Sequence, residues 1–139
     1  MTPSGPEQPL NGSANRIDSF RHAFAGWAEL LRATPNARIH LAFGLGVVGL
    51  GLWLGISRLE WAILWAMIGL VFASEFANSA LEAAVNLASP DLHPLAKSAK
   101  DMAAGGVLFA ACSAAVVGLL ILGPPLVVRL FPELRSLFY

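Results

Sequence analysis

Charged residues are scarce in this sequence. They make up 13% of the 139 residues, whereas hydrophobic residues make up 56%. A soluble domain averages roughly 25% charged residues, so this chain lacks the polar side chains that would cover a surface facing water. The shortage argues against an ordinary soluble domain and predicts a protein that folds in a membrane.

The chain also lacks an excess of either charge, because nine Lys and Arg residues balance nine Asp and Glu residues. Binding to the phosphates of nucleic acid needs a basic surface, so nucleic acid is not an expected partner. Cysteine is nearly absent: Cys112 is the single one, so neither an internal disulfide nor a cysteine metal cluster is possible. We interpret Cys112 as a small core residue.

The N-terminal residues 1–15 are rich in Pro, Gly, Ser and Asn and lack the apolar core of a signal peptide, so they are predicted to form a disordered tail. In residues 17–33, aromatic residues recur at helical spacing between charged positions, which predicts an amphipathic helix lying in the membrane interface. The aromatic positions are Phe20, Phe24 and Trp27. Pro35 is expected to end this helix, because it biases Thr34 away from helical dihedrals.

Three apolar segments follow, at residues 39–57, 61–89 and 101–123. A helix rises ~1.5 Å per residue, so the first segment alone approaches the ~30 Å of a hydrocarbon core. Its five glycines predict a face for close helix packing; they are Gly44, Gly46, Gly49, Gly51 and Gly55. Two prolines after Gly123 are expected to end the last helix and leave residues 124–139 as a short tail. The predicted fold is an all-α membrane protein with one surface helix and three transmembrane helices, residues 16–123 forming the membrane domain.

The distribution of basic residues predicts the orientation of these spans. Four arginines precede the first span and two lysines lie between the second and third, whereas the turn after the first span offers only one arginine. The four arginines are Arg16, Arg21, Arg32 and Arg38, the two lysines are Lys97 and Lys100, and the arginine of the turn is Arg58. The positive-inside rule then places the N-terminus and the second connector in the cytoplasm.

The second span carries a line of polar residues, here called the polar stripe: Glu75, Asn78, Ser79, Glu82 and Asn86. Because successive helical residues rotate by ~100°, all five fall on one side of the helix. Carboxylates at membrane depth need a partner or water, so the stripe is expected to face a protein interior or a wet cavity. It is interpreted either as a seam that locks helices together or as a site for general-base and magnesium chemistry, because hard oxygen ligands favour Mg²⁺ shared with phosphate.

Lys100 and Asp101 lie near the start of the third span, close to the membrane surface. There the lysine can bind a phosphate group and the aspartate can orient that group. The alternative is that the lysine only anchors the protein at the membrane surface and that Asp101 only caps the helix.

The string "EFANSALEAAVNLASPDLHPLAKSAKDMAAGGVL" resembles the signature of the prokaryotic diacylglycerol kinase family, which includes the undecaprenol kinases of Gram-positive bacteria. "SFRHAFAGW" is similar to the family's surface helix and "NARIHLAF" to the start of its first span. The resemblance covers residues 19–122 and implies a lipid kinase of the bacterial inner membrane, assembled as a homotrimer with composite active sites. Such enzymes transfer the γ-phosphoryl group of ATP, with Mg²⁺, to the hydroxyl of undecaprenol or diacylglycerol at the cytoplasmic face. They have no P-loop, and none is present here.

The resemblance also implies roles for individual residues. Glu75 is the candidate general base, Asn78 an amide that orients the substrate, and Glu82 a metal ligand. Lys100 and Asp101, with Asn86, form the end that binds the nucleotide. No site is expected at His22, His40 or His93, since none has a Cys or His at metal-ligand spacing.

Two positions depart from the family pattern. Thr34 occupies the place of a second metal-binding glutamate, for which Glu29 is the candidate substitute, and Asn86 replaces an aspartate. These departures keep open a catalytically silent membrane scaffold that binds nucleotide or lipid. A small transporter or proton relay would also use intramembrane carboxylates, but it explains Lys100 and the surface helix less well.

Overall fold

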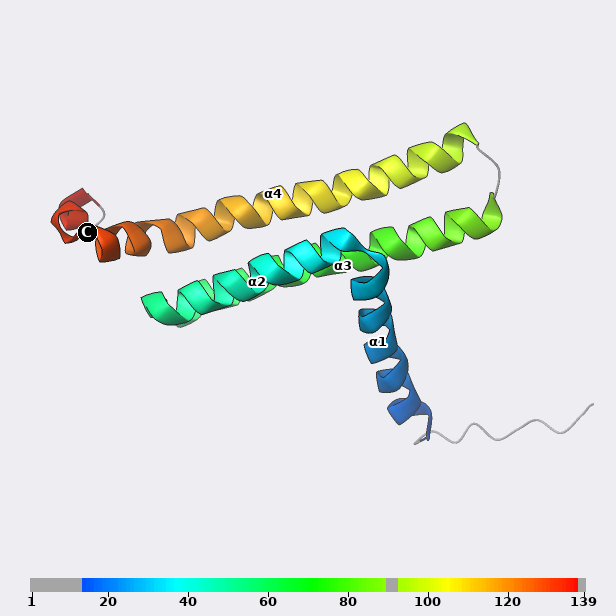
Figure 1. Cartoon of the computed structure of the whole chain (residues 1–139), viewed down its shortest axis with the longest axis horizontal. Coiled ribbons are helices and arrows are strands. Elements are labelled where there is room, and N and C mark those ends of the chain that lie inside the picture. The colour runs from blue at the N-terminus through cyan, green and yellow to red at the C-terminus, as the bar shows by residue number, and fades with distance from the viewer. Residues whose placement is uncertain (1–13, 90–92, 138–139) are drawn as a thin grey trace, which may run out of the picture. The chain divides into compact units, whose positions relative to one another are not determined.

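The computed structural model describes residues 14–89 and 93–137, and the regular elements in these ranges are all helical. One compact unit contains α1 (Ala14–Ala33). The other contains α2 (Pro35–Leu54), α3 (Arg58–Ala88), α4 (Pro94–Leu130) and the short 3-10 helix η1 (Pro132–Leu137) (Figure 1). The predicted all-helical class is confirmed, and α2, α3 and α4 are each long and apolar enough to cross a membrane. The predicted disordered tail lies outside the described residues, except that residues 14 and 15 belong to α1.

Local sequence signals explain where α1 ends and where α2 begins and ends. Thr34 is extended, with φ −113° and ψ 106°, because the ring of Pro35 disfavours helical dihedrals in the preceding residue. Pro35 opens α2, where its missing N–H would have no helical partner. Gly55 closes α2 in the left-handed conformation, with φ 68°, and its N–H donates to the carbonyl of Gly51. The helix therefore runs from Pro35 to Leu54 rather than from 39 to 57.

A capping box starts α3. The Ser57 hydroxyl accepts from the Glu60 N–H at 3.3 Å, and the Glu60 carboxylate accepts from the Ser57 N–H at 2.6 Å. This reciprocal pair satisfies two of the donors that a helix N-terminus leaves free. With 31 residues, α3 is about 46 Å long, which exceeds the ~30 Å of a hydrocarbon core.

The limits of α4 correct the prediction at both ends. The helix begins at Pro94 rather than 101, because proline suits the first turn and the His93 ring accepts from the Leu95 N–H at 3.2 Å. It also does not stop at Gly123 but continues through Pro124 and Pro125 to Leu130. Membrane helices tolerate such prolines when neighbouring groups support the freed backbone.

The last turns of α4 are held against α2. The guanidinium of Arg129 lies 5.5 Å from the centre of the Trp53 ring, a distance at which the positive charge is attracted to the face of the indole. This contact helps to explain why the predicted tail is helical.

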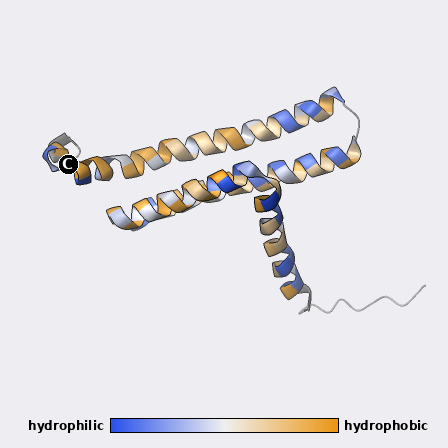
Figure 2. Ribbon diagram, viewed as in Figure 1, coloured by the Kyte–Doolittle hydropathy of each residue, from blue (hydrophilic) through white to orange (hydrophobic). Residues whose placement is uncertain are grey.

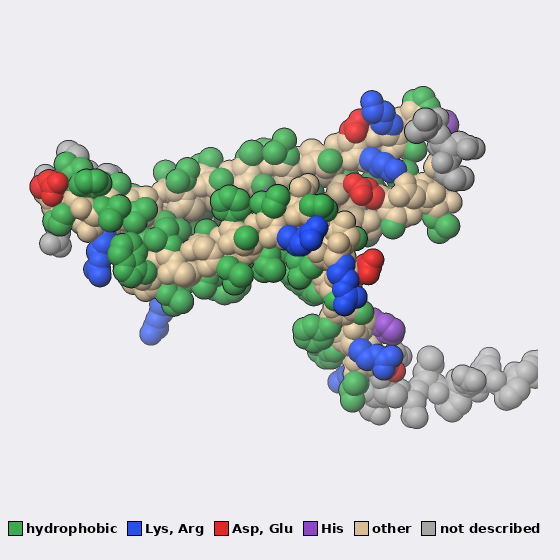
Figure 3. Space-filling view, viewed as in Figure 1, with side chains coloured by type: hydrophobic (Ala, Val, Ile, Leu, Met, Phe, Trp, Pro, Cys, Tyr) green, Lys and Arg blue, Asp and Glu red, His purple; other side chains and the backbone are tan. Residues whose placement is uncertain are grey.

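Packing within this unit is dominated by α3 and α4, which run antiparallel, while α2 contacts both (Figure 1). Few side chains are buried; the apolar ones in these helices are Ala37, Leu64, Val71, Phe72, Val107, Ala110 and Leu122. Hydrophilic residues gather where the end of α3 meets the start of α4 (Figure 2), and charged side chains gather there too (Figure 3). The middle of the helices is covered by outward apolar side chains, which suits lipid as the surrounding medium.

The predicted glycine packing face of α2 is only partly present. A Cβ atom on Gly51 would lie 3.0 Å from the Trp61 ring, and one on Gly44 would lie 3.9 Å from Ile68. At Gly46 and Gly49 no atom from elsewhere in the described residues lies within 4 Å of that position. Gly51 is thus the glycine that close packing requires.

Candidate functional site

An open cavity of about 290 Å³, here called the polar cleft, lies between α2, the polar half of α3, and α4. Its polar lining residues are Asn36, His40, Glu75, Asn78 and Glu82. Small and apolar residues of α4 complete the wall, namely Ala104, Val107, Leu108 and Ala111. The structure thus brings together three residues of the predicted site and shows that the polar stripe faces the neighbouring helices.

Glu75 is the most deeply buried polar residue of the cleft, with only 1% of its side chain exposed. Its Oε1 atom lies 3.2 Å from Nε2 of His40, an ion-pair distance when the imidazole is protonated. The alignment is not that of a hydrogen bond, so Oε1 has no hydrogen-bond partner among the described residues. A buried carboxylate oxygen without such a partner can accept a proton or a hydrogen bond from a ligand.

Asn78 and Glu82 form a second polar pair in the cleft. The Asn78 amide donates to Glu82 Oε1 at 3.2 Å, whereas the Asn78 carbonyl oxygen is buried and has no hydrogen-bond partner in the described chain. The Glu82 carboxylate is exposed. The Asn78 amide is thereby held in place. The Asn78 carbonyl oxygen and the accessible Glu82 carboxylate remain as oxygen atoms that can bind a metal ion or a ligand.

The predicted nucleotide end is separate from the lining of the cleft. Lys100 donates to the side-chain oxygen of Asn86 at 2.5 Å and so joins the start of α4 to the end of α3. Asp101 is exposed. Lys100 precedes the cleft residue Ala104 by about one helical turn, which keeps its ammonium group near the polar end of the cleft.

Thr34 and Glu29 are the two positions considered in the sequence analysis for a second metal ligand. The Thr34 hydroxyl lies 3.4 Å from that of Ser79, so residue 34 adjoins the polar stripe. Glu29 lies on α1, in the other compact unit, and its part in a metal site stays a prediction.

The donor set of the cleft fits magnesium only when phosphate supplies further ligands. Among the described residues, no group of three or more His, Cys, Asp or Glu side chains could enclose a metal ion. Mg²⁺ is commonly held by one or two carboxylates together with substrate phosphates and water. Glu82, with the free carbonyl oxygen of Asn78 beside it, matches that pattern.

Asn36 and His40 are the polar residues of the cleft that our sequence analysis missed. The signal was present, because His40 is the one ionisable side chain in the first apolar segment, and an ionisable group at membrane depth suggests a functional site. Its pairing with Glu75 could not be inferred from either helix alone.

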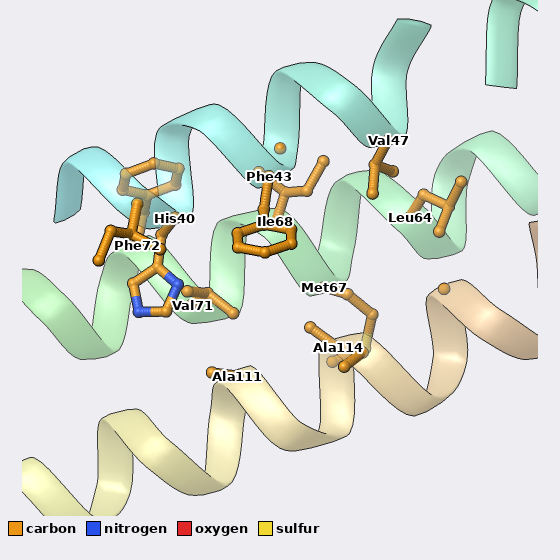
Figure 4. A pocket seen from close by; sticks show the side chains of 14 residues that line it. His40, Phe43, Val47, Leu64, Met67, Ile68, Val71, Phe72, Ala111 and Ala114 are labelled. Carbon is orange, nitrogen blue, oxygen red and sulfur yellow. The ribbon is translucent and has the colours of Figure 1, made fainter. Parts of the chain in front are cut away.

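A second cavity, of about 280 Å³, lies beside the polar cleft and is here called the apolar cavity. It is lined by α2, α3 and α4 (Figure 4), and almost all of its lining is hydrocarbon. Ile39, His40 and Ala111 line both cavities, so the two spaces adjoin.

Comparison with known proteins identifies the family of this chain. The undecaprenol kinase of Bacillus subtilis is 41% identical over 108 residues, which are 78% of this chain and 88% of that protein. The diacylglycerol kinase of Synechocystis sp. is 39% identical over 128 residues, 88% of this chain and 73% of the relative. A diacylglycerol kinase of Pseudomonas aeruginosa is 31% identical over 102 residues, 73% and 82% of the two chains. Residues 21–122 match the sequence model of one family, and the chain therefore belongs to the prokaryotic diacylglycerol kinases.

Proposed function

We propose that this protein transfers the γ-phosphoryl group of ATP to the hydroxyl of a membrane lipid at the cytoplasmic face of the bacterial inner membrane. The lipid is undecaprenol or diacylglycerol, the substrates for which two of its relatives are named. The observation that carries the proposal is the buried Glu75 carboxylate, whose Oε1 atom has no hydrogen-bond partner in the described chain and lines a cleft between three helices able to cross a membrane.

In this reaction Glu75 is the general base. Its carboxylate takes the proton of the lipid hydroxyl, the hydroxyl oxygen forms a bond to the γ-phosphorus, and the bond from that phosphorus to the bridging oxygen of ADP breaks. The apolar cavity beside the cleft offers space for hydrocarbon next to a reacting headgroup. Asn78, already fixed by Glu82, orients the acceptor.

The remaining residues act on the nucleotide. Lys100 attracts the phosphates, Asn86 holds the lysine in place, and Asp101 extends the nucleotide end. Glu82 is the metal ligand, with Glu29 as a second candidate. Mg²⁺, when bound, neutralises phosphate charge, and phosphoryl transfer depends mainly on such positioning and charge stabilisation.

The first experiment measures transfer of labelled γ-phosphate by the purified protein in detergent with Mg²⁺, offering diacylglycerol and undecaprenol in parallel. Labelled product from either lipid supports the proposal and identifies the substrate. Absence of product from both, while a known kinase of the family is active in the same micelles, overturns it. The catalytically silent scaffold, favoured by Thr34 and Asn86, would then be the better description.

The base assignment has its own test, Glu75→Gln. Amide replacement removes the proton acceptor while keeping the shape, so turnover is expected to fall by about 10² to 10⁴, with ATP binding unchanged. Glu133→Gln in the exposed start of η1 is the matched control and should be without effect. Equal losses of turnover and ATP binding would indicate a structural role for Glu75.

We also propose assembly as a homotrimer, since a second copy would cover part of the outward apolar surface of α2, α3 and α4. Chemical cross-linking in mild detergent should give species of up to three chains. A purely monomeric species at concentrations where the protein is active would exclude this assembly.

A further inference from the structure

His40 occupies the point where the polar cleft meets the apolar cavity. It lines both spaces, and Figure 4 shows its imidazole projecting from α2 past Val71 of α3 toward Ala111 of α4. In the reaction proposed above, the lipid hydroxyl must come to Glu75 at this junction. His40 is therefore placed where the headgroup and the hydrocarbon of a substrate would separate.

The surroundings of Glu75 make a partner necessary. A carboxylate with 1% exposure is removed from water, and an unpaired charge in such a place is strongly disfavoured. His40 Nε2, at 3.2 Å, is the one basic group found at ion-pair distance from Glu75 among the described residues. No hydrogen-bond partner replaces it at Oε1, so this imidazole is the polar neighbour that can hold Oε1 in place.

The geometry of the pair leaves room for a substrate. The two atoms are close, but they are not aligned as a hydrogen bond, and about 20% of the His40 side chain is exposed. The imidazole can thus hold the carboxyl group in place while Oε1 still accepts a hydrogen bond from a hydroxyl group. A fully aligned and enclosed pair would leave less freedom for that contact.

We propose that His40 is a positioning residue for lipid phosphorylation, whose Nε2 atom holds the Glu75 carboxyl group in place and directs it into the cleft. The inference rests on the proposed function, in which Glu75 is the base. In this proposal a residue of α2 positions the base, a role for which the polar stripe of α3 offers no residue.

Two substitutions at residue 40 separate positioning from simple packing. His40→Leu fills similar space without a donor, whereas His40→Gln can place an amide N–H near the position of Nε2. We expect His40→Leu to lower kcat by about 10- to 100-fold, the effect of misplacing a reacting group, with an unchanged KM for ATP. His40→Gln should recover most of that loss. His22→Gln on exposed α1 is the control. Equal losses in both His40 variants, or no loss in His40→Leu, would overturn the inference.

A double-mutant cycle tests the link to Glu75 without relying on catalysis. Thermal unfolding midpoints are measured for the unchanged protein, His40→Leu, Glu75→Gln and the double variant. If His40 holds the Glu75 carboxyl group, His40→Leu lowers the midpoint of the unchanged protein more than it lowers that of Glu75→Gln. Additive changes overturn the pairing even in an active enzyme. Coupling in a protein that phosphorylates neither lipid overturns the proposed function while the pairing stands.

Discussion

Thr34 adjoins the polar stripe, and it is the position at which the family resemblance led us to expect a metal-binding glutamate. Its hydroxyl is 3.4 Å from that of Ser79, and Glu82 follows Ser79 by three residues, which places both on one face of α3. A glutamate at residue 34 would add a carboxylate near Glu82. We therefore predict that Thr34→Glu lowers the Mg²⁺ concentration for half-maximal activity about tenfold, which corresponds to roughly 1.4 kcal/mol of added attraction.

The matched control for this prediction is Thr34→Gln, which has the same length but no charge. Titrations of activity with Mg²⁺ should separate the two variants. Identical titrations for Glu and Gln at residue 34 would show that another residue, such as Glu29, already supplies the missing charge.

Lys100 offers a second prediction at the scale of single residues. Its ammonium group is held by Asn86 at 2.5 Å rather than by a carboxylate, so its charge stays available for phosphate. Loss of one charge-assisted hydrogen bond is worth roughly 1.5–3 kcal/mol. Lys100→Met should therefore raise the KM for ATP about tenfold or more, with little change in the KM for lipid.

Lys97→Met is the control for that measurement, because Lys97 is exposed and lies on the same end of α4. It removes an equal positive charge from the membrane surface. If both variants raise the KM for ATP equally, Lys100 acts through general surface charge, and its specific phosphate contact is refuted.

The sequence predicted the residues of α3 in the cleft better than those of α2. A rotation of ~100° per residue places Glu75, Asn78 and Glu82 on one side of a helix, whatever its neighbours are. His40 was not predicted because its importance comes from its contact with Glu75, which lies 35 positions later in the chain and on another helix. The residue spacing within α2 or within α3 does not indicate that His40 and Glu75 are neighbours.

At the scale of elements, Gly51 allows α2 to approach the start of α3. A Cβ atom there would lie 3.0 Å from the Trp61 ring and 3.1 Å from Ile56, so a larger side chain would overpack the contact. We predict that Gly51→Leu lowers the free energy of unfolding by about 1–3 kcal/mol, measured by circular dichroism during titration with a denaturing detergent.

Gly49→Leu provides the comparison, since no atom from another part of the described chain lies within 4 Å of the corresponding position. Its free energy of unfolding should stay close to that of the unchanged protein. A loss at Gly49 as large as that at Gly51 would mean that helix propensity or lipid contacts, rather than the Trp61 contact, set the cost.

The helix ends differ in how well local sequence predicted them. The end of α1 was predicted because Pro35 acts on the residue directly before it. The end of α4 was not, because two prolines normally stop a helix in water, whereas a membrane helix can continue with the support of its neighbours. The contact between Arg129 and Trp53 joins residues from two helices, and no local pattern indicates it.

At the scale of the whole molecule, the residues of the candidate site lie toward one end of the helical unit. Hydrophilic residues gather where α3 ends and α4 begins (Figure 2), and the polar cleft, Asn86 and Lys100 belong to the same region of these helices. The opposite ends of α2 and α3 meet at a short turn with a single arginine, Arg58. A kinase that uses cytoplasmic ATP therefore needs the polar end inside the cell.

This requirement and the positive-inside rule predict the same orientation from independent physics, one from the location of ATP and the other from the distribution of arginine and lysine. The test uses single cysteines in a Cys112→Ser background, because Cys112 is the natural thiol and is exposed. Leu59→Cys reports on the turn before α3 and Ser98→Cys on the start of α4; both positions are exposed. A membrane-impermeant maleimide should label the first variant in intact spheroplasts and the second only after lysis. The reverse pattern would place the cleft outside the cell, away from ATP, and would contradict both the orientation and the proposed reaction.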